Sequence, residues 1–246
     1  MEQIEQATAG RIVSVKVTVW TFTNETREIN IDVLDVCADS VRKIFWWLFK
    51  IRFPVYRASG HDPRLIVRGT KPSLHASGLA VDVNDTMNPY YDAVEHVIIP
   101  ERLADRGADR KRIEGELRDE LKLPELEVRA VLERIIQEEG SDDWFLNRGV
   151  FRDGMVTDLV VAIFRLHGFD IWGGKWRQPM DYMHFQCSRS LAEQLLPVPY
   201  DKSSEIWRKH VANCSGGMWK TRWGMFFHLT VSTLTRCWNR FGVSKK

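Results

Sequence analysis

Residues Ser73–Asn84, S-L-H-A-S-G-L-A-V-D-V-N, contain the pattern that decides the fold. The second half of this stretch alternates in the way that a β-strand does. One face carries Leu79, Val81 and Val83, and the other carries Ala80, Asp82 and Asn84. A carboxylate on a polar strand face is ordinarily an edge residue paired with a neighbour. Because Asp82 follows His75 by seven residues and lies just past a glycine, it can instead be a metal ligand.

A second stretch, G-F-D-I-W-G-G-K-W-R-Q-P-M-D-Y-M-H-F-Q at residues 168–186, ends in another predicted strand. Alternation there places His184 on the face opposite the apolar one. Two strands that each present one ligand, together with His75 from the preceding loop, can close a His-Asp-His triangle. Three nitrogen or oxygen ligands with a fourth position left open are typical of a catalytic zinc site.

Small residues near the first motif fit a metal site. Gly78 permits the tight turn that folds His75 back, and Ala80 leaves space beside Asp82. A single histidine in a loop is more often structural or exposed than a ligand. His61, in a G-H-D-P turn, is the alternative ligand.

The joint pattern S-x-H-x-x-G-x-A-x-D, followed by W-G-G-x-W-x-x-x-x-D-x-x-H-F, resembles a known family. It is that of the zinc D-alanyl-D-alanine carboxypeptidases and L-alanyl-D-glutamate endopeptidases, which includes vancomycin-resistance dipeptidases and phage endolysins. The resemblance covers residues 30–100 and 155–190. It implies the hedgehog/DD-peptidase-like fold, an α+β fold in which a small antiparallel sheet carries a zinc site and helices flank it.

The resemblance also implies the site residues. The positions that match Zn²⁺ ligands are His75, Asp82 and His184. Asp181 matches the catalytic acid/base of the family. A free aspartate titrates near 3.9, so Asp181 needs desolvation to carry a proton effectively. The residues that can provide an apolar wall, and that are candidates for substrate binding, are Trp172, Trp176 and Tyr182.

Two further residues complete the predicted site. Arg57, in P-V-Y-R-A-S-G, resembles the arginine that steadies the scissile carbonyl in the family, although Arg64 and Arg68 lie nearby as alternatives. Ser73 of the first motif is a candidate for substrate binding.

The function implied by the resemblance is hydrolysis of peptide bonds in the peptidoglycan stem peptide. We expect an L-alanyl-D-glutamate endopeptidase that acts as a phage or prophage endolysin. The alternatives are a D-alanyl-D-alanine carboxypeptidase or dipeptidase, and a non-catalytic zinc-containing module that binds the cell wall. Asp181 favours an enzyme, because a structural zinc site usually closes with a fourth protein ligand and needs no spare carboxylate.

The composition predicts one catalytic domain with two additions. Residues 1–200 form the domain, and they include a charged helical insertion at 101–140, where 21 of 40 residues are charged. Residues 201–246 form a basic tail with nine Lys or Arg against two Asp or Glu. Because the tail also contains tryptophans, we expect it either to cap the domain or to meet an anionic membrane or envelope surface. Nucleic acid is a less favoured partner, and a monomer is favoured.

Local patterns predict further elements. Residues 11–23 are rich in β-branched residues and predict a strand or hairpin, whereas apolar residues at helical spacing predict a helix over 32–52. Another helix is predicted from its N-cap Thr157 to His167, with Gly168 as its stop.

The remaining observations concern location. The four cysteines form no C-x-x-C pair, and no apolar run reaches the roughly 20 residues of a membrane span. The start M-E-Q-I-E-Q is acidic, unlike a signal peptide. We therefore expect a cytoplasmic protein on synthesis that acts on the cell wall after its release.

Overall fold

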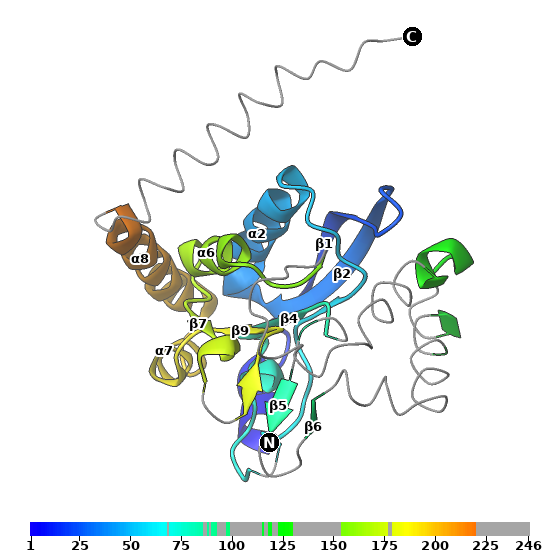
Figure 1. Cartoon of the computed structure of the whole chain (residues 1–246). Helices are drawn as coiled ribbons and strands as arrows, with labels where there is room; N and C mark the ends of the chain where they lie inside the picture. Colours follow the sequence, from blue (N-terminus) through cyan, green and yellow to red (C-terminus); the bar gives the residue numbers. More distant parts are fainter. Residues whose placement is uncertain are drawn as a thin grey trace.

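The computed structural model describes residues 1–67, 69–85, 88, 90–92, 97–98, 115, 118–119, 123–129, 154–176 and 179–219. These residues form an α+β fold in which small antiparallel sheets are flanked by helices, as the sequence predicts (Figure 1). The strands are β1 (Ile12–Trp20), β2 (Thr26–Leu34), β3 (Ala58–Ser59), β4 (Ala80–Val83), β5 (Tyr90–Asp92), β6 (Val97–Ile98), β7 (Ile171–Trp172), β8 (Met180–Asp181) and β9 (His184–Gln186).

The helices include both α-helices and short 3₁₀ helices. The α-helices are α1 (Glu2–Thr8), α2 (Ala38–Lys50), α6 (Asp158–Leu166), α7 (Arg189–Leu195) and α8 (Tyr200–Trp219). The 3₁₀ helices are η1 (Asp35–Cys37), η2 (Leu74–Ser77) and η4 (Gly173–Lys175).

The hairpin of β1 and β2 supplies one wall of the core. Its two strands pair in unbroken register from Ile12 opposite Leu34 to Trp20 opposite Thr26. The predicted helix over 32–52 is wrong at its start, because residues 32–34 still belong to β2 and α2 begins only at Ala38. Cross-strand pairing decides these residues, since Ile31 and Val33 alternate into the core beside β1.

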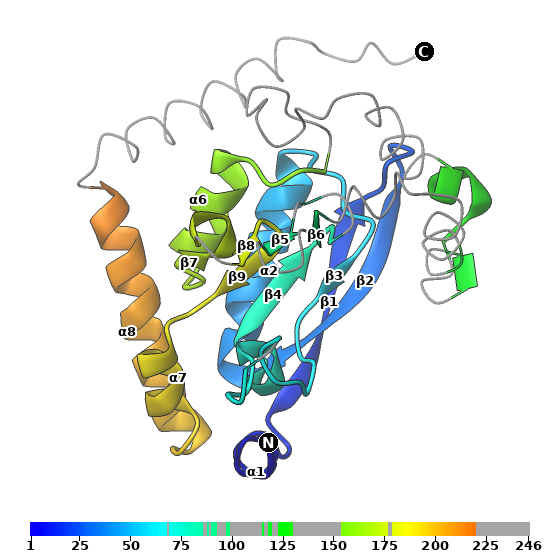
Figure 2. The same ribbon diagram turned by 60° about the horizontal axis from the view of Figure 1, so that its bottom comes forward.

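The helices α2, α6 and α8 pack side by side, and α2 also contacts β1. Figure 2 shows α6 between α2 and α8, and contacts join α6 to both of these helices. The predicted N-cap is confirmed, because the Thr157 hydroxyl accepts a hydrogen bond from the Val160 amide at 3.3 Å. The rings of Phe164 and Phe185 stack with their centroids 3.8 Å apart. This stack fixes α6 against β9, which carries His184.

The four-stranded sheet, in the order β3-β4-β9-β7, lies in the middle of the molecule. Asn84, just after β4, is buried, and its side chain connects three segments of the backbone by hydrogen bonds. Its Oδ1 accepts a hydrogen bond from the Tyr56 amide at 3.0 Å. Its Nδ2 donates to the carbonyl oxygens of Pro54 and Gly154 at 2.8 and 2.9 Å. The polar face of this strand is therefore used for structure at Asn84 and is available for chemistry at Asp82.

The two predicted additions are described only in part. Most of the charged stretch 101–140 lies outside the described residues, but at 123–129 a helical turn begins after Pro124 and buries Leu123 and Val128. The predicted tail is helical through Trp219, and α8 packs on α6 and α7. The tail beyond that residue lies outside the described part. None of the helices in the described ranges is long and apolar enough to cross a membrane.

Candidate active site

Strand pairing brings two of the predicted ligands together. β4 and β9 are antiparallel neighbours, and their register sets Asp82 directly opposite His184. Residues opposite each other on one face of such a pair lie close enough for their side chains to touch. The third residue, His75, lies in η2, and Gly78 ends this helix in the left-handed region with φ of +67°. That turn leads the chain directly into β4 and so places His75 beside Asp82.

The donor atoms of these three residues converge. Nε2 of His75 lies 3.1 Å from Oδ2 of Asp82, and Nδ1 of His184 lies 2.9 Å from Oδ1 of Asp82. The two ring nitrogens are 3.1 Å from each other. Ligand atoms about 2.0–2.1 Å from one tetrahedral Zn²⁺ lie about 3.3 Å apart. The spacing of the donor atoms of these three residues is thus close to that of ligands around a single ion.

Each histidine has an outer partner that fixes its ring. Nδ1 of His75 lies 2.5 Å from the carbonyl oxygen of Gly60, and Nε2 of His184 lies 2.8 Å from Oε1 of Gln186. Because both of these partners are acceptors, the ring nitrogens beside them carry the protons. The other nitrogens then direct their lone pairs at the shared centre, which is the arrangement that outer partners give to metal ligands.

The three groups also stabilise one another's charge. Burial alone would raise the pKa of Asp82. In the metal-free chain the charge of a protonated His75, and the hydrogen bonds that both histidines donate when their inner nitrogens also carry protons, outweigh burial and hold this pKa well below its usual range. Burial alone would lower the pKa of His184, but the hydrogen bond and charge of Asp82 outweigh it and raise this pKa. Asp82 is therefore ionised at neutral pH, the state that binds a metal.

A second carboxylate, that of the half-buried Asp181, lies nearby. Asp181 ends β8 opposite Tyr90 of β5. Its Oδ1 is buried and has no hydrogen-bond partner among the described residues. Burial, followed by the negative charge of Asp82, raises the pKa of Asp181 to about 6. The side chain therefore has the desolvation that an aspartate needs to carry a proton effectively, and it can exchange a proton near neutral pH.

The helix η4 holds the backbone of Asp181 in place. Gly173 packs so closely on the Asp181 carbonyl oxygen that a Cβ at this position would collide with it. The glycines of the W-G-G-x-W motif thus have a packing role beside the site.

Comparison with known proteins agrees with this geometry. Residues 68–187, about half of the chain, match the family model described as D-alanyl-D-alanine carboxypeptidase. This part of the chain belongs to that zinc peptidase family. No curated protein and no solved structure matches the chain. The protein is a zinc metallopeptidase, and its substrate is a peptidoglycan-derived peptide.

The residues present fit the cofactor of a zinc peptidase. His75, Asp82 and His184 form a group that could hold a metal ion, with two nitrogens and one oxygen as donors. Imidazole and carboxylate are both ordinary zinc ligands, and three of them leave a coordination position for substrate. His61, the alternative ligand, is not among the donor atoms that converge here.

The arginine that the peptidase would use is harder to assign. Arg57 precedes β3, in which Ser59 is paired with Asp82. Arg57 lies two residues before Ser59, and its backbone carbonyl oxygen accepts a hydrogen bond from the Asn84 amide at 2.9 Å. Its Nη1 lies 3.2 Å from Oδ2 of Asp85. Arg64 contributes to the electrostatics of the site, because its positive charge slightly lowers the pKa of Asp181 against the larger effects that raise it.

The third candidate, Arg68, lies outside the described residues. Arg57 is close in sequence to Ser59, which pairs with Asp82, whereas the charge of Arg64 acts on Asp181. Each arginine thus has one observation in its favour, and the role of Arg57 stays a prediction.

Of the three aromatic residues predicted near the site, two contact each other and the third lies beside His184. The rings of Trp172 and Tyr182 meet edge to face at 4.9 Å, and Trp172 Nε1 donates to the Tyr182 carbonyl oxygen at 2.9 Å. The ring of Trp176 lies 5.2 Å from that of His184. Ser73 caps η2, since its hydroxyl accepts a hydrogen bond from the His75 amide at 3.3 Å. The structure thus shows Ser73 positioning a predicted ligand.

A second group of possible metal donors consists of Asp170, His210 and Cys214. Nε2 of His210 lies 2.9 Å from the Gly168 carbonyl oxygen and 3.4 Å from Oδ1 of Asp170. The hydrogen bond to Gly168 and the ion pair with Asp170 already use this ring nitrogen. We therefore interpret the cluster as a structural contact that holds α8 against the turn after α6.

Proposed function

We propose that the protein is an endopeptidase that cuts the L-alanyl–D-glutamyl bond of the peptidoglycan stem peptide. The observation that carries the proposal is the convergence of three donor atoms near Asp181, a half-buried residue whose buried Oδ1 has no hydrogen-bond partner among the described residues. A metal-binding module without catalysis would have no use for that carboxylate.

In this proposal His75, Asp82 and His184 hold the Zn²⁺ ion, with Gly60 and Gln186 as the outer partners of the two histidines. A bound Zn²⁺ supplies a Lewis acid that polarises the scissile carbonyl and makes a water molecule more acidic. The outer hydrogen bonds keep each imidazole in the tautomer that presents a lone pair to the ion.

Asp181 is the proposed general base and general acid. Its carboxylate takes a proton from the attacking water while the water oxygen bonds to the scissile carbonyl carbon. It then delivers this proton to the nitrogen of the leaving amine as the C–N bond breaks. Two observations support this role: one oxygen of Asp181 has no hydrogen-bond partner in the described part of the chain, and its pKa is raised to about 6.

Arg57 is the proposed donor to the carbonyl oxygen of the scissile bond, on which negative charge develops. Donors of this kind contribute about 3–4 kcal/mol to the stability of the transition state. The position of Arg57 two residues from Ser59, which pairs with Asp82, supports this role. Trp172, Trp176 and Tyr182 are the proposed contacts for the substrate peptide, and Ser73 remains a further candidate.

A D-alanyl-D-alanine carboxypeptidase is the second candidate, because the matching family model carries that description. The two activities use the same site chemistry. They differ in which peptide bond of the stem peptide is placed beside Asp181 and the metal-binding residues for cleavage. We further propose that the enzyme acts as a phage or prophage endolysin, and that the basic tail meets an anionic envelope surface. The excess of Lys and Arg over residues 201–246 supports this role.

Mass spectrometry of purified peptidoglycan after digestion with the zinc-loaded enzyme tests the proposed bond. An endopeptidase of this specificity produces new glutamyl amino termini and new alanyl carboxyl termini. Release of free D-alanine would instead establish the carboxypeptidase. Peptidoglycan whose peptides keep all their bonds would contradict both. For the endolysin role, we expect the protein to lyse cells whose outer barrier has been permeabilised.

A further inference from the structure

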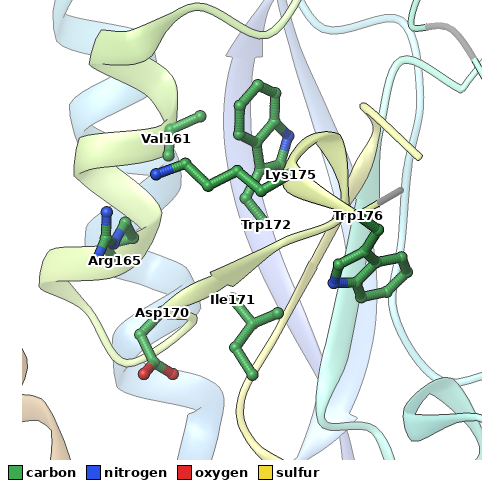
Figure 3. A pocket seen from close by; sticks show the side chains of 7 residues that line it. All are labelled: Val161, Arg165, Asp170, Ile171, Trp172, Lys175 and Trp176. Atoms are coloured by element: carbon green, nitrogen blue, oxygen red, sulfur yellow. The ribbon is translucent and has the colours of Figure 1, made fainter. Parts of the chain in front are cut away.

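A cavity of about 260 Å³ opens beside the candidate active site (Figure 3). Its wall comes from α6, β7 and η4, elements that the proposed chemistry uses only in part. Trp176 belongs to both places, since it lines the cavity and its ring lies 5.2 Å from that of His184. A peptide held at His184 can therefore place a neighbouring group in this cavity.

The lining of the cavity carries a net positive charge. Arg165 of α6 and Lys175 of η4 both line it. In the described part of the chain, neither of them forms an ion pair. The single acidic lining residue, Asp170, is already paired with His210 at 3.4 Å. The charge of Arg165 lowers the pKa of Asp170, but its effect is smaller than those of burial and of His210. Two cationic side chains thus remain available to an anionic group.

The positions of the two cations are set by the fold. Figure 3 shows the Lys175 side chain extending from η4 toward α6, the helix that carries Arg165. The backbone of η4 is pressed against two neighbours, because a Cβ on Gly174 would collide with the Trp172 ring and a Cβ on Gly173 with the Asp181 carbonyl oxygen. The segment that carries Lys175 is therefore packed directly against the backbone of the proposed proton carrier.

We propose that this cavity is a subsite for a carboxylate group of the substrate, bound by Arg165 and Lys175. Hydrogen bonds from guanidinium and ammonium groups to carboxylates are short and strong, and the tryptophans exclude part of the surrounding water. The inference rests on the proposed function. The carboxylate has two possible sources, the free carboxylate of the glutamyl residue in the stem peptide and the carboxyl terminus of its last D-alanine.

Cleavage of a soluble stem peptide and two amides of it tests the subsite. One amide blocks the glutamyl carboxylate and the other blocks the carboxyl terminus. With the zinc-loaded full-length enzyme, we expect one amide to lower kcat/KM about tenfold, mainly through KM, as for the loss of one charge-assisted hydrogen bond. The amide that has this effect identifies the source of the carboxylate.

The variant Arg165→Gln/Lys175→Gln is expected to lose this discrimination. The double variant should cut the unmodified peptide about as slowly as the wild type cuts the amide that identifies the subsite. It should cut that amide at the same rate as the wild type does. Lys16→Gln, which removes one exposed positive charge from the β1–β2 hairpin, should discriminate as the wild type does. Arg165→Lys and Lys175→Arg, which keep the charge, should retain most of the preference.

Wild-type discrimination in the double variant would overturn the subsite while leaving the proposed function intact, because cleavage itself would persist. Equal slowing of all three peptides in the double variant, with no preference retained in the charge-keeping variants, would also overturn it. A wild-type enzyme that cuts none of the peptides would overturn the proposed function, and the subsite with it.

Discussion

At the scale of single residues, the facing ring nitrogens of His75 and His184 are the central feature. They lie 3.1 Å apart, and the outer hydrogen bonds to Gly60 and Gln186 leave a lone pair on each facing the other. Two lone pairs at this distance repel each other unless a cation or a proton lies between them. A Zn²⁺ ion held by these two nitrogens and by Asp82 would remove this repulsion.

Loss of His184 should therefore abolish metal binding. The variant His184→Ala is expected to fall from about one zinc per chain to nearly none after dialysis, because two ligands remain of the three that a catalytic zinc site requires. Elemental analysis measures the zinc content. His61→Ala, which changes a histidine outside the converging group, should keep its zinc. Full zinc occupancy in His184→Ala would disprove the assigned ligand.

The sequence predicts that these three side chains meet, because a histidine and a carboxylate on the polar faces of two strands can be identified from alternation. The outer partners were not predicted. Gly60 acts through its backbone carbonyl, which every residue type possesses, so its identity carries no signal. Gln186 is two residues from His184 on the same strand face, and that spacing could have identified it.

At the scale of elements, the contact between α8 and the turn after α6 has a clear electrostatic component. Burial alone would lower the pKa of His210, but hydrogen bonds involving Asp170, Cys214 and the Gly168 carbonyl oxygen raise it to about 10. Trp207, one turn earlier on α8, is buried and donates a hydrogen bond to Ser40 at 3.0 Å. This part of the predicted tail thus packs against α2 and α6.

The stability that His210 contributes should depend on pH. Its pKa is higher in the folded chain than the unfolded value of about 6.5, so the contribution is complete below that pH and is lost as the pH rises toward about 10. Thermal unfolding of His210→Gln should therefore show a deficit relative to wild type that is largest near pH 6 and shrinks toward pH 10. The control His61→Gln should show no such trend. A deficit for His210→Gln that stays constant over this range would contradict the ion pair.

The elements differ in how far their sequences determine them. The helix α6 was predicted to within a residue, because a threonine cap, an apolar stripe and a glycine stop agree there. The strand β2 was partly assigned to a helix. Its residues gain their strand conformation from pairing with β1, and Val33, which faces the core, also fits a helical spacing with Val36 and Cys37. The apolar spacing of residues 32–34 alone does not reveal this pairing with the neighbouring strand.

At the scale of the whole molecule, a buried ion pair ties the charged stretch to the core. Nη1 of Arg27 in β2 lies 3.0 Å from Oε2 of Glu127, whose side chain is only 3% exposed. Arg27 also donates to the carbonyl oxygen of Tyr56 at 2.7 Å, next to Arg57. The described part of the insertion is therefore connected to the segment that carries a candidate catalytic arginine.

Breaking this pair on one side should be costly. Arg27→Met leaves the Glu127 carboxylate buried without its partner, and we expect a loss of about 3 kcal/mol in the free energy of unfolding. Arg27→Met/Glu127→Leu should recover a large part of this loss, because it removes both charges. Denaturant unfolding measures both variants. A double variant less stable than Arg27→Met would contradict the interpretation.

The central claim is that a zinc ion on His75, Asp82 and His184 and a proton carrier at Asp181 together hydrolyse the stem peptide. The rate of stem-peptide cleavage by zinc-loaded Asp181→Asn tests it most directly. This variant keeps the shape and the three ligands but cannot exchange the proton, so the rate is expected to fall by about 10²–10⁴-fold with its zinc retained. Cleavage at the wild-type rate by this protein would contradict the account.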